Sequence, residues 1–151
     1  MVDVVTPEKR SQMMARIRAK DTKPELVIRS GLHKLGYRFR LHDSCLPGKP
    51  DLVLRKYNAA IFVHGCFWHV HECNMFKWPQ TREKFWRTKL LRNREVDITS
   101  LAAVQALGWR TAVAWECAVR GTLKKSISTV LSELDDWLQA GQSNLEIGSK
   151  I

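Results

Sequence analysis

A run of eight residues near the middle of the chain concentrates cysteine, histidine and aromatic side chains. The run from Cys66 to Cys73 reads CFWHVHEC, and Cys117 follows 44 residues later. Zinc takes four thiolate or imidazole ligands in a tetrahedron, and a tight loop often supplies some of them while the fold brings the others. The spacing therefore predicts a structural zinc site whose ligands are Cys66, His71, Cys73 and Cys117.

Two alternatives to this ligand set remain open. His69 lies in the same run and competes as a ligand. Buried thiols beside surface histidines, with no metal, are the other alternative, because a buried free cysteine is ordinary. Cys45 stands apart and reads as a lone thiol. If His71 is the ligand, His69 and His64 remain for proton transfer, since His64 ends an apolar strand and His69 lies near it.

A carboxylate follows Pro50 directly, at the start of an otherwise apolar strand. Burying Asp51 there without a partner would be costly, so we expect it to bind a cation or to accept hydrogen bonds from backbone donors in the turn. Glu25, in the helix that precedes the sheet, could approach it. The residues alone favour a different role for Glu25, as the partner of Thr22 in a capping box.

Pairs of large apolar residues lie among basic ones. Phe67 and Trp68 occupy a polar loop, Phe85 and Trp86 a basic helix, and Met14 a second basic helix. Apolar side chains set among Lys and Arg can wedge between base steps or stack on bases. The alternative is that they are core anchors of the metal-binding loop.

The chain of 151 residues carries 25 Lys and Arg against 15 Asp and Glu, a formal net charge of +10. Residues 8–40 contain ten basic and three acidic residues, residues 77–95 seven and two, and residues 126–151 one and four. This segregation favours a polyanionic partner, with nucleic acid first and an anionic membrane surface or an acidic protein second. A soluble basic domain without such a partner is the remaining interpretation.

Composition bounds the class of protein. A single domain of this length with 44% hydrophobic residues can bury a core and fold alone. No apolar run is long enough to span a membrane, and the first residues lack the pattern of a signal peptide. We therefore expect a soluble, cytoplasmic protein with reduced cysteines.

The elements that position these residues follow from periodicity and turn signals. We expect helices over residues 7–19, 23–35 and 82–107, the last as one helix or two, and a final helix that Thr122 caps. Strands are expected over residues 37–41, 51–55, 59–63 and 109–116. The long helical crossover makes the last two strands parallel. The predicted fold class is therefore α/β, with a mixed four-stranded sheet flanked by helices.

Several of these features together resemble one family, the very-short-patch-repair (Vsr) mismatch endonucleases of the PD-(D/E)xK nuclease superfamily. The resemblance runs from about residue 10 to Gly121 and rests on Glu25, Pro50-Asp51, Ile61-Phe-Val-His64, Gly65-Cys-Phe-Trp-His69 and Trp115-Glu116-Cys117. It implies a restriction-endonuclease-like fold with a zinc-pinned loop. It also implies an enzyme that nicks DNA 5′ of the T in a T:G mismatch left by deamination of 5-methylcytosine, which begins very short patch repair.

The resemblance assigns roles to single residues. Asp51 is the Mg²⁺-binding carboxylate, assisted by the main-chain carbonyl of the neighbouring strand near Val63. His69 is the general base or acid, and His64 and Glu25 assist through water and metal-bound solvent. The side chains implied to enter the base stack are Phe67, Trp68, Trp86 and Met14.

The chain departs from the superfamily pattern on the strand after Asp51. Phe62 and His64 occupy the places of the second acid and the lysine. Asn93 and Asp97 are further candidate catalytic residues. A catalytically inert, zinc-stabilised DNA-binding module and a restriction-type endonuclease of the same fold are the alternative functions.

The resemblance also suggests a division of the chain and its partners. Residues 1–20 would form a basic DNA-contacting arm, residues 21–140 the endonuclease core, and residues 141–151 a C-terminal tail. The expected partner is double-stranded DNA with a T:G mismatch, bound by a monomer associated with the nucleoid. Mismatch-repair proteins are a further class of partner.

Overall fold

The computed structural model describes residues 22–121 and 124–149. The predicted helix over residues 7–19, the proposed arm of residues 1–20, Met14 and Thr122 therefore lie outside the described residues. Within them, the helices of four or more residues are α2 (Lys23–Lys34), α3 (Glu83–Ala106), α4 (Glu116–Val119) and α5 (Ile127–Ala140). The strands are β1 (Arg40–Leu41), β2 (Leu52–Leu54), β3 (Ala59–His64), β4 (Arg110–Trp115) and β5 (Asn144–Ile147).

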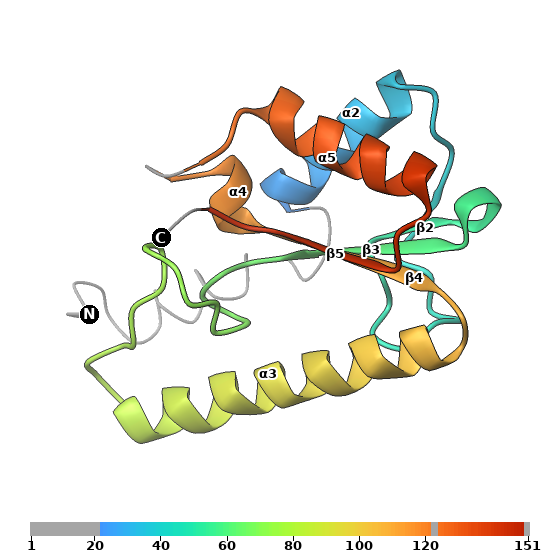
Figure 1. Ribbon diagram of the computed structural model, residues 1–151. Coiled ribbons are helices and arrows are strands. Elements are labelled where there is room, and N and C mark those ends of the chain that lie inside the picture. Colours follow the sequence, from blue (N-terminus) through green and yellow to red (C-terminus); the bar gives the residue numbers. More distant parts are fainter. Residues whose placement is uncertain (1–21, 122–123, 150–151) are drawn as a thin grey trace.

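The five strands form one mixed sheet in the order β1-β2-β3-β4-β5 (Figure 1). β1, β2 and β3 are antiparallel neighbours, whereas β4 and β5 run parallel to β3. In the parallel pair, His64 at the end of β3 lies beside Trp115 at the end of β4. The carboxyl ends of both strands therefore meet at one edge of the sheet, from which the loop of residues 65–82 departs.

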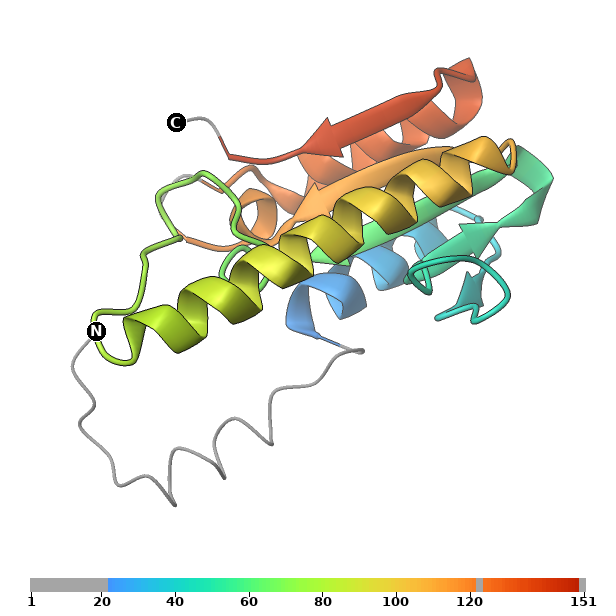
Figure 2. The same ribbon diagram turned by 90° about the horizontal axis from the view of Figure 1, so that it is seen from below.

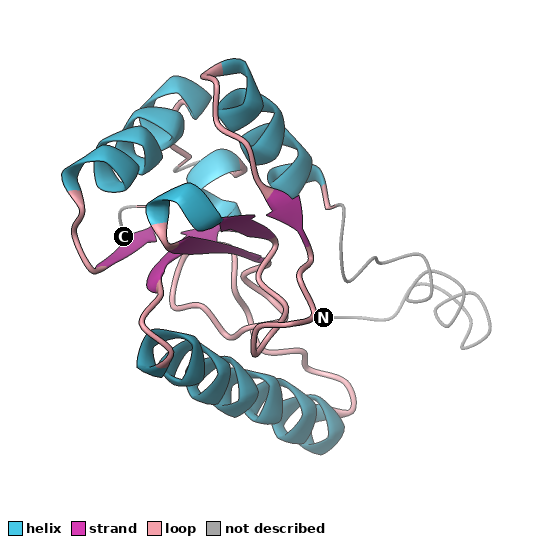
Figure 3. Cartoon of the chain, turned by 90° about the vertical axis from the view of Figure 1, so that its right-hand side faces the viewer, coloured by secondary structure: helices cyan, strands magenta, loops and turns pink. Residues whose placement is uncertain are grey.

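Helices cover both faces of the sheet (Figure 3). α2 and α5 pack together on one face, where Ile28, Leu32, Leu134 and Trp137 are buried in the main core. α3 lies on the other face, over a smaller core that contains Phe62 and Val104. The first half of α3 reaches past the ends of the strands, beside the loop of residues 65–82 (Figure 2). The described residues contain no helix of the length and apolarity that a membrane crossing requires.

The α/β fold class is confirmed, with one strand more than predicted. Residues 144–147, placed in the C-terminal tail, pair with β4 as β5. The sequence pattern that predicts this strand is short, because only Leu145 and Ile147 turn toward the core while Asn144 and Glu146 are exposed. The region of residues 82–107 is one helix of 24 residues. The last helix begins later than expected, because Ser126, and not Thr122, caps it by accepting a hydrogen bond from the Thr129 N–H.

Arg110, the first residue of β4, ties the sheet to the end of α5. Its guanidinium donates to the carbonyls of Tyr57, Trp137, Leu138 and Gln142. Two of these carbonyls, those of Trp137 and Leu138, lie in the last turn of α5, where carbonyl groups lack partners further along the helix, so the cation supplies donors at the negative end of the helix dipole. The guanidinium also lies 4.8 Å from the centroid of the Trp137 ring.

We predict that Arg110→Lys lowers the free energy of unfolding by about 2 kcal/mol or more, because one ammonium cannot reach all of these carbonyls and hydrogen bonds to charged groups contribute about 1.5–3 kcal/mol each. Urea denaturation followed by circular dichroism measures the change. Arg55→Lys is the matched control, since that side chain is 59% exposed and forms a loose ion pair with Asp43 at 3.7 Å. Equal stability of the two variants would contradict this role.

Candidate active site

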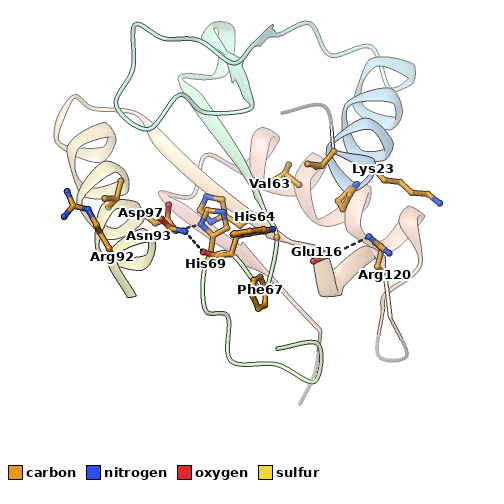
Figure 4. A pocket seen from close by; sticks show the side chains of 15 residues that line it. Lys23, Val63, His64, Phe67, His69, Arg92, Asn93, Asp97, Glu116 and Arg120 are labelled. Atoms are coloured by element: carbon orange, nitrogen blue, oxygen red, sulfur yellow. Dashed lines mark hydrogen bonds and ion pairs between the residues drawn. The ribbon is translucent and has the colours of Figure 1, made fainter. Parts of the chain in front are cut away.

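A cavity of about 720 Å³ opens at the sheet edge where β3 and β4 end. Its walls are the start of α2, the end of β3, the loop that follows β3, one side of α3 and the segment around α4 (Figure 4). The polar side chains aimed at it include those of His64, His69, Asn93, Asp97 and Glu116. Candidate catalytic residues from distant parts of the sequence thus line one open space.

Two histidines and a carboxylate at this cavity, His64, His69 and Asp97, contact one another in that order. The rings of His64 and His69 stack with their centroids 4.0 Å apart and their planes 6° from parallel. His69 Nδ1 is hydrogen bonded to Asp97 Oδ2 on α3. A carboxylate on one ring nitrogen fixes the orientation of an imidazole and leaves the other nitrogen to act on a substrate. Asp97 thus has a defined position beside His69.

His64 is held in its neutral form. Burial, together with the neighbouring His69 ring, lowers its pKa to about 3. Its Nδ1 atom is buried and has no hydrogen-bond partner among the described residues. A buried nitrogen without a partner is costly, so its presence at a cavity wall indicates a position where a ligand or water contributes the missing hydrogen bond.

The loop after β3 is fastened on two sides. The amide of Asn93 on α3 donates to the Trp68 carbonyl over 3.2 Å. The N–H of Cys66 donates to Glu116 Oε1 over 3.2 Å, and Arg120 holds the other oxygen of Glu116 at 3.0 Å. Asn93 therefore positions the loop that carries His69.

Asp51 lies on the other side of Val63, at the end of the β1–β2 hairpin where its connecting loop begins and ends. Its Oδ2 atom accepts the N–H of Val63 over 2.7 Å. The sequence suggested backbone donors in the turn, but this donor comes from the neighbouring strand. Its Oδ1 atom lies 4.0 Å from His42 Nε2. The pKa of Asp51 is raised to about 8, first by burial and also by the Glu25 carboxylate, while the hydrogen bond from the Val63 N–H acts in the opposite direction.

Glu25 faces this site instead of capping its own helix. Its side chain is 1% exposed, and its Oε2 atom lies 2.8 Å from both Arg29 Nη1 and His42 Nε2. Thr22 makes no side-chain capping hydrogen bond. The capping box favoured by the sequence is therefore wrong. The buried carboxylate of Glu25 is hydrogen bonded to the side chains of Arg29 and His42 and not to the backbone at the start of its helix.

His42 was missed by the analysis of the sequence. It is the residue after β1, and its N–H donates to the Asp51 carbonyl over 3.1 Å. The predicted antiparallel strands offered a signal, because the two residues that flank a hairpin loop lie opposite each other. Glu25, His42 and Asp51 each present a ligand atom, and these atoms lie within 4.8 Å of one another.

The four predicted cysteine and histidine ligands also come together. The Sγ atoms of Cys66 and Cys117 each lie 3.5 Å from His71 Nδ1, and the four ligand atoms of Cys66, His71, Cys73 and Cys117 lie within 4.8 Å of one another. Metal distances of about 2.0–2.3 Å in a tetrahedron place its ligand atoms about 3.5–3.8 Å apart. This donor set could therefore hold a metal ion.

The surroundings of the cluster suit thiolates. The N–H of Cys117 donates to Cys66 Sγ over 3.3 Å, and the N–H of Ser149 donates to Cys117 Sγ over 3.2 Å. Burial raises the pKa of the Cys66 thiol, so a cation is needed to keep that sulfur ionised. His69, the competing ligand, is bonded to Asp97 instead, and Cys45 is exposed and apart.

The aromatic residues form a cluster at the mouth of the cavity. Trp86 is 4% exposed, and its ring lies 5.5 Å from that of Phe67 and 6.0 Å from that of Trp68. Phe67 and Trp68 are only partly buried and line the cavity. Phe85, in contrast, is 43% exposed. Trp86 is thus a core anchor of this cluster, as the second interpretation expects, whereas Phe67 and Trp68 form its less buried part, and their contact with bases stays a prediction.

Comparisons with known proteins give consistent results. Residues 2–75 match the family model described as DNA mismatch endonuclease Vsr. The chain is similar to the type II nicking enzyme V.XorIIP of Xanthomonas oryzae pv. oryzae, with 44% identity over 87% of this chain and 98% of the relative. It is also similar to the DNA mismatch endonuclease Vsr of Escherichia coli K12, with 39% identity over 99% of this chain and 96% of the relative. The type II nicking enzyme V.NmeAIP of Neisseria meningitidis is 37% identical over 90% of this chain and 99% of its own length.

We predict that Co²⁺ added to chelator-treated protein produces the intense sulfur-to-cobalt absorption of a tetrahedral thiolate site, at one ion per chain. Cys117→Ser is expected to abolish that absorption, because it removes one of the four ligands. Cys45→Ser is the matched control and should leave it unchanged, since Cys45 is exposed and lies outside the cluster. A spectrum without thiolate absorption, or an absorption that persists in Cys117→Ser, would contradict metal binding by this cluster.

Proposed function

The chain belongs to the Vsr family of DNA mismatch endonucleases, and from this premise we propose that it is a Mg²⁺-dependent DNA nickase. It cuts 5′ of the T in T:G mismatches that arise from deamination of 5-methylcytosine and so initiates very short patch repair. The observation that carries the proposal is the arrangement around Val63. This residue of β3 lies between the Asp51 carboxylate and the stacked pair of histidines, His64 and His69. The Val63 N–H binds Asp51, and the next residue is His64.

Cleavage of a phosphodiester requires charge stabilisation at the phosphoryl oxygens and proton transfer to or from the reacting groups. Asp51 would hold Mg²⁺ together with the Val63 carbonyl, and the bound ion would supply the charge stabilisation. One carboxylate binds Mg²⁺ weakly, so oxygens of the DNA backbone complete the coordination. The buried carboxylate of Glu25 would orient solvent beside Asp51.

Proton transfer falls to His69. Its Nδ1 is bonded to Asp97, so Nε2 is the nitrogen that faces a substrate as general base or acid. His64 stacks on His69 and remains neutral, which lets it share a hydrogen bond with solvent without adding a second positive charge. Asn93 holds the loop in place through the Trp68 carbonyl. Asp97 and Asn93 therefore act as positioning residues for His69.

Recognition of the mismatch would use the aromatic cluster. Phe67 and Trp68 enter the base stack beside the T:G pair, with Trp86 behind them, while Met14 acts from the opposite side. Unstacking costs least at a mismatched step, which favours T:G over paired DNA. Structural Zn²⁺ held by Cys66, His71, Cys73 and Cys117 would keep the loop that carries these aromatics in one conformation.

The basic surface provides the general attraction to DNA. Arg92 lines the cavity and Arg94 a neighbouring one, both on the half of α3 that reaches past the sheet. Lys89 lies 5.8 Å from the Trp68 ring. Contacts between such basic side chains and DNA phosphates are independent of sequence and weaken steeply with salt. These basic residues support a DNA partner, which we propose is double-stranded and is bound by one copy of the chain.

A second candidate is a nickase of the same chemistry directed to another sequence, because two of the relatives are described as type II nicking enzymes. The two candidates differ in substrate and not in mechanism. A panel of duplexes with one T:G pair in different flanking sequences, CT(A/T)GG among them, separates the two.

We predict that Asp51→Ala lowers the single-turnover nicking rate of a T:G duplex in Mg²⁺ by at least about 100-fold while duplex binding is retained, because the change removes the cation ligand and leaves the basic surface intact. Glu83→Ala is the control, since that carboxylate is 59% exposed, lies outside the residues that line the cavity and pairs with Arg87. Tight binding without any cleavage by the unaltered protein would instead support the inert DNA-binding module.

We also predict that Trp68→Ala lowers the preference for T:G over T:A duplexes by at least about tenfold, since stacking of one aromatic on a base contributes about 1–3 kcal/mol. Nicking rates of the two duplexes give the preference, and circular dichroism verifies the fold. Phe85→Ala is the matched control, because Phe85 lies outside the residues that line the cavity. Unchanged discrimination in a folded Trp68→Ala variant would remove Trp68 from mismatch recognition.

A further inference from the structure

The cation site at Asp51 has a third member that the proposed mechanism does not use. His42 directly follows β1 and has a left-handed backbone conformation, with φ of 48°. Its N–H is bonded to the Asp51 carbonyl, so the backbone holds the imidazole beside that carboxylate. The side chain is 18% exposed, which leaves the ring reachable from solvent. His42 is thus placed at the site by the hairpin itself.

The spacing of the three side chains suits one metal ion. His42 Nε2 lies 2.8 Å from Glu25 Oε2 and 4.0 Å from Asp51 Oδ1. Metal-to-ligand distances of about 2.1 Å in an octahedron place neighbouring ligand atoms about 3 Å apart and opposite ones about 4.2 Å apart. The observed 2.8 Å is close to the first of these spacings and 4.0 Å is close to the second. An ion between these atoms would replace the hydrogen bond between His42 and Glu25.

The charges around the site also favour a cation. Glu25 and Asp51 bring two carboxylates together, and Glu25 is almost completely buried. Arg29 binds the Oε2 atom of Glu25 and balances part of that charge. Val63 turns Asp51 Oδ2 toward the strand, which leaves Oδ1 on the side of His42. Like charges held this closely are stabilised by a divalent ion between them.

We propose that His42 is a nitrogen ligand of the cation bound by Glu25 and Asp51, and that the site therefore prefers Mn²⁺ or Co²⁺ to Mg²⁺. Imidazole suits transition metals, whereas Mg²⁺ takes oxygen ligands and would rely on the two carboxylates. This inference deepens the proposed function and rests on it for the use of the ion in cleavage, and it has Glu25 bind the ion directly instead of through solvent. The competing role of His42 is to position Glu25 by a hydrogen bond alone.

Mn²⁺ bound to the full-length, zinc-loaded protein without DNA separates these roles. Electron spin echo envelope modulation detects a nitrogen bound directly to Mn²⁺, and labelling of histidine with ¹⁵N identifies that nitrogen as imidazole. We expect the modulation in the unaltered protein and its loss in His42→Gln, with Mn²⁺ affinity lowered about 10–100-fold and Mg²⁺ affinity changed by less than about threefold. His33→Gln, an exposed histidine of α2, is the matched control.

Asp51→Asn should weaken Mn²⁺ binding and thereby assigns the signal to this site and not to His64 and His69. No histidine modulation in the unaltered protein, or modulation that persists in His42→Gln, would overturn the assignment. The same protein samples are also tested for nicking in Mn²⁺ and in Mg²⁺. Histidine modulation without nicking would support His42 as a ligand and contradict the proposed nickase. Nicking without histidine modulation would support the nickase and contradict His42 as a ligand.

Discussion

The hydrogen bond from the Val63 N–H to the Asp51 carboxylate is the interaction on which the candidate active site depends. It crosses from β3 to the loop end of the β1–β2 hairpin and fixes one oxygen of a half-buried acid. The same strand ends one residue later at His64, which stacks on His69. One short piece of backbone therefore sets the distance between a cation site and a proton-transfer site, as cleavage of a phosphodiester requires.

A second constraint acts on the loop that follows β3. The loop contains little regular structure, and its backbone is held by Glu116, by Asn93 and by the Cys66, His71, Cys73 and Cys117 cluster. Such a loop would otherwise have many conformations, and ordering it costs about 1–2 kcal/mol of backbone entropy per residue. In the proposed function a bound metal would offset that cost, and one ordered loop would then present His69 to the backbone of DNA and Phe67 and Trp68 to its bases.

Local signals made much of this arrangement predictable. The four clustered ligands, Asp51 after a proline, and the parallel pair of strands all follow from spacing and periodicity within short segments. The direction of the Glu25 side chain does not, because a capping box and a buried contact with His42 require the same helix start. His42, Arg110 and β5 depend on which segments lie side by side. Their partners are supplied by tertiary packing and are invisible within any one window of sequence.

The central claim is that this one edge of the sheet both recognises a T:G pair and cuts one strand beside it. Mapping of the products at single-nucleotide resolution, from a duplex with either strand end-labelled, tests it most directly. The account predicts one break, 5′ of the mismatched T, with a 3′-hydroxyl and a 5′-phosphate, and an intact G strand. Breaks in both strands, or equal cutting of the fully paired duplex, would contradict it.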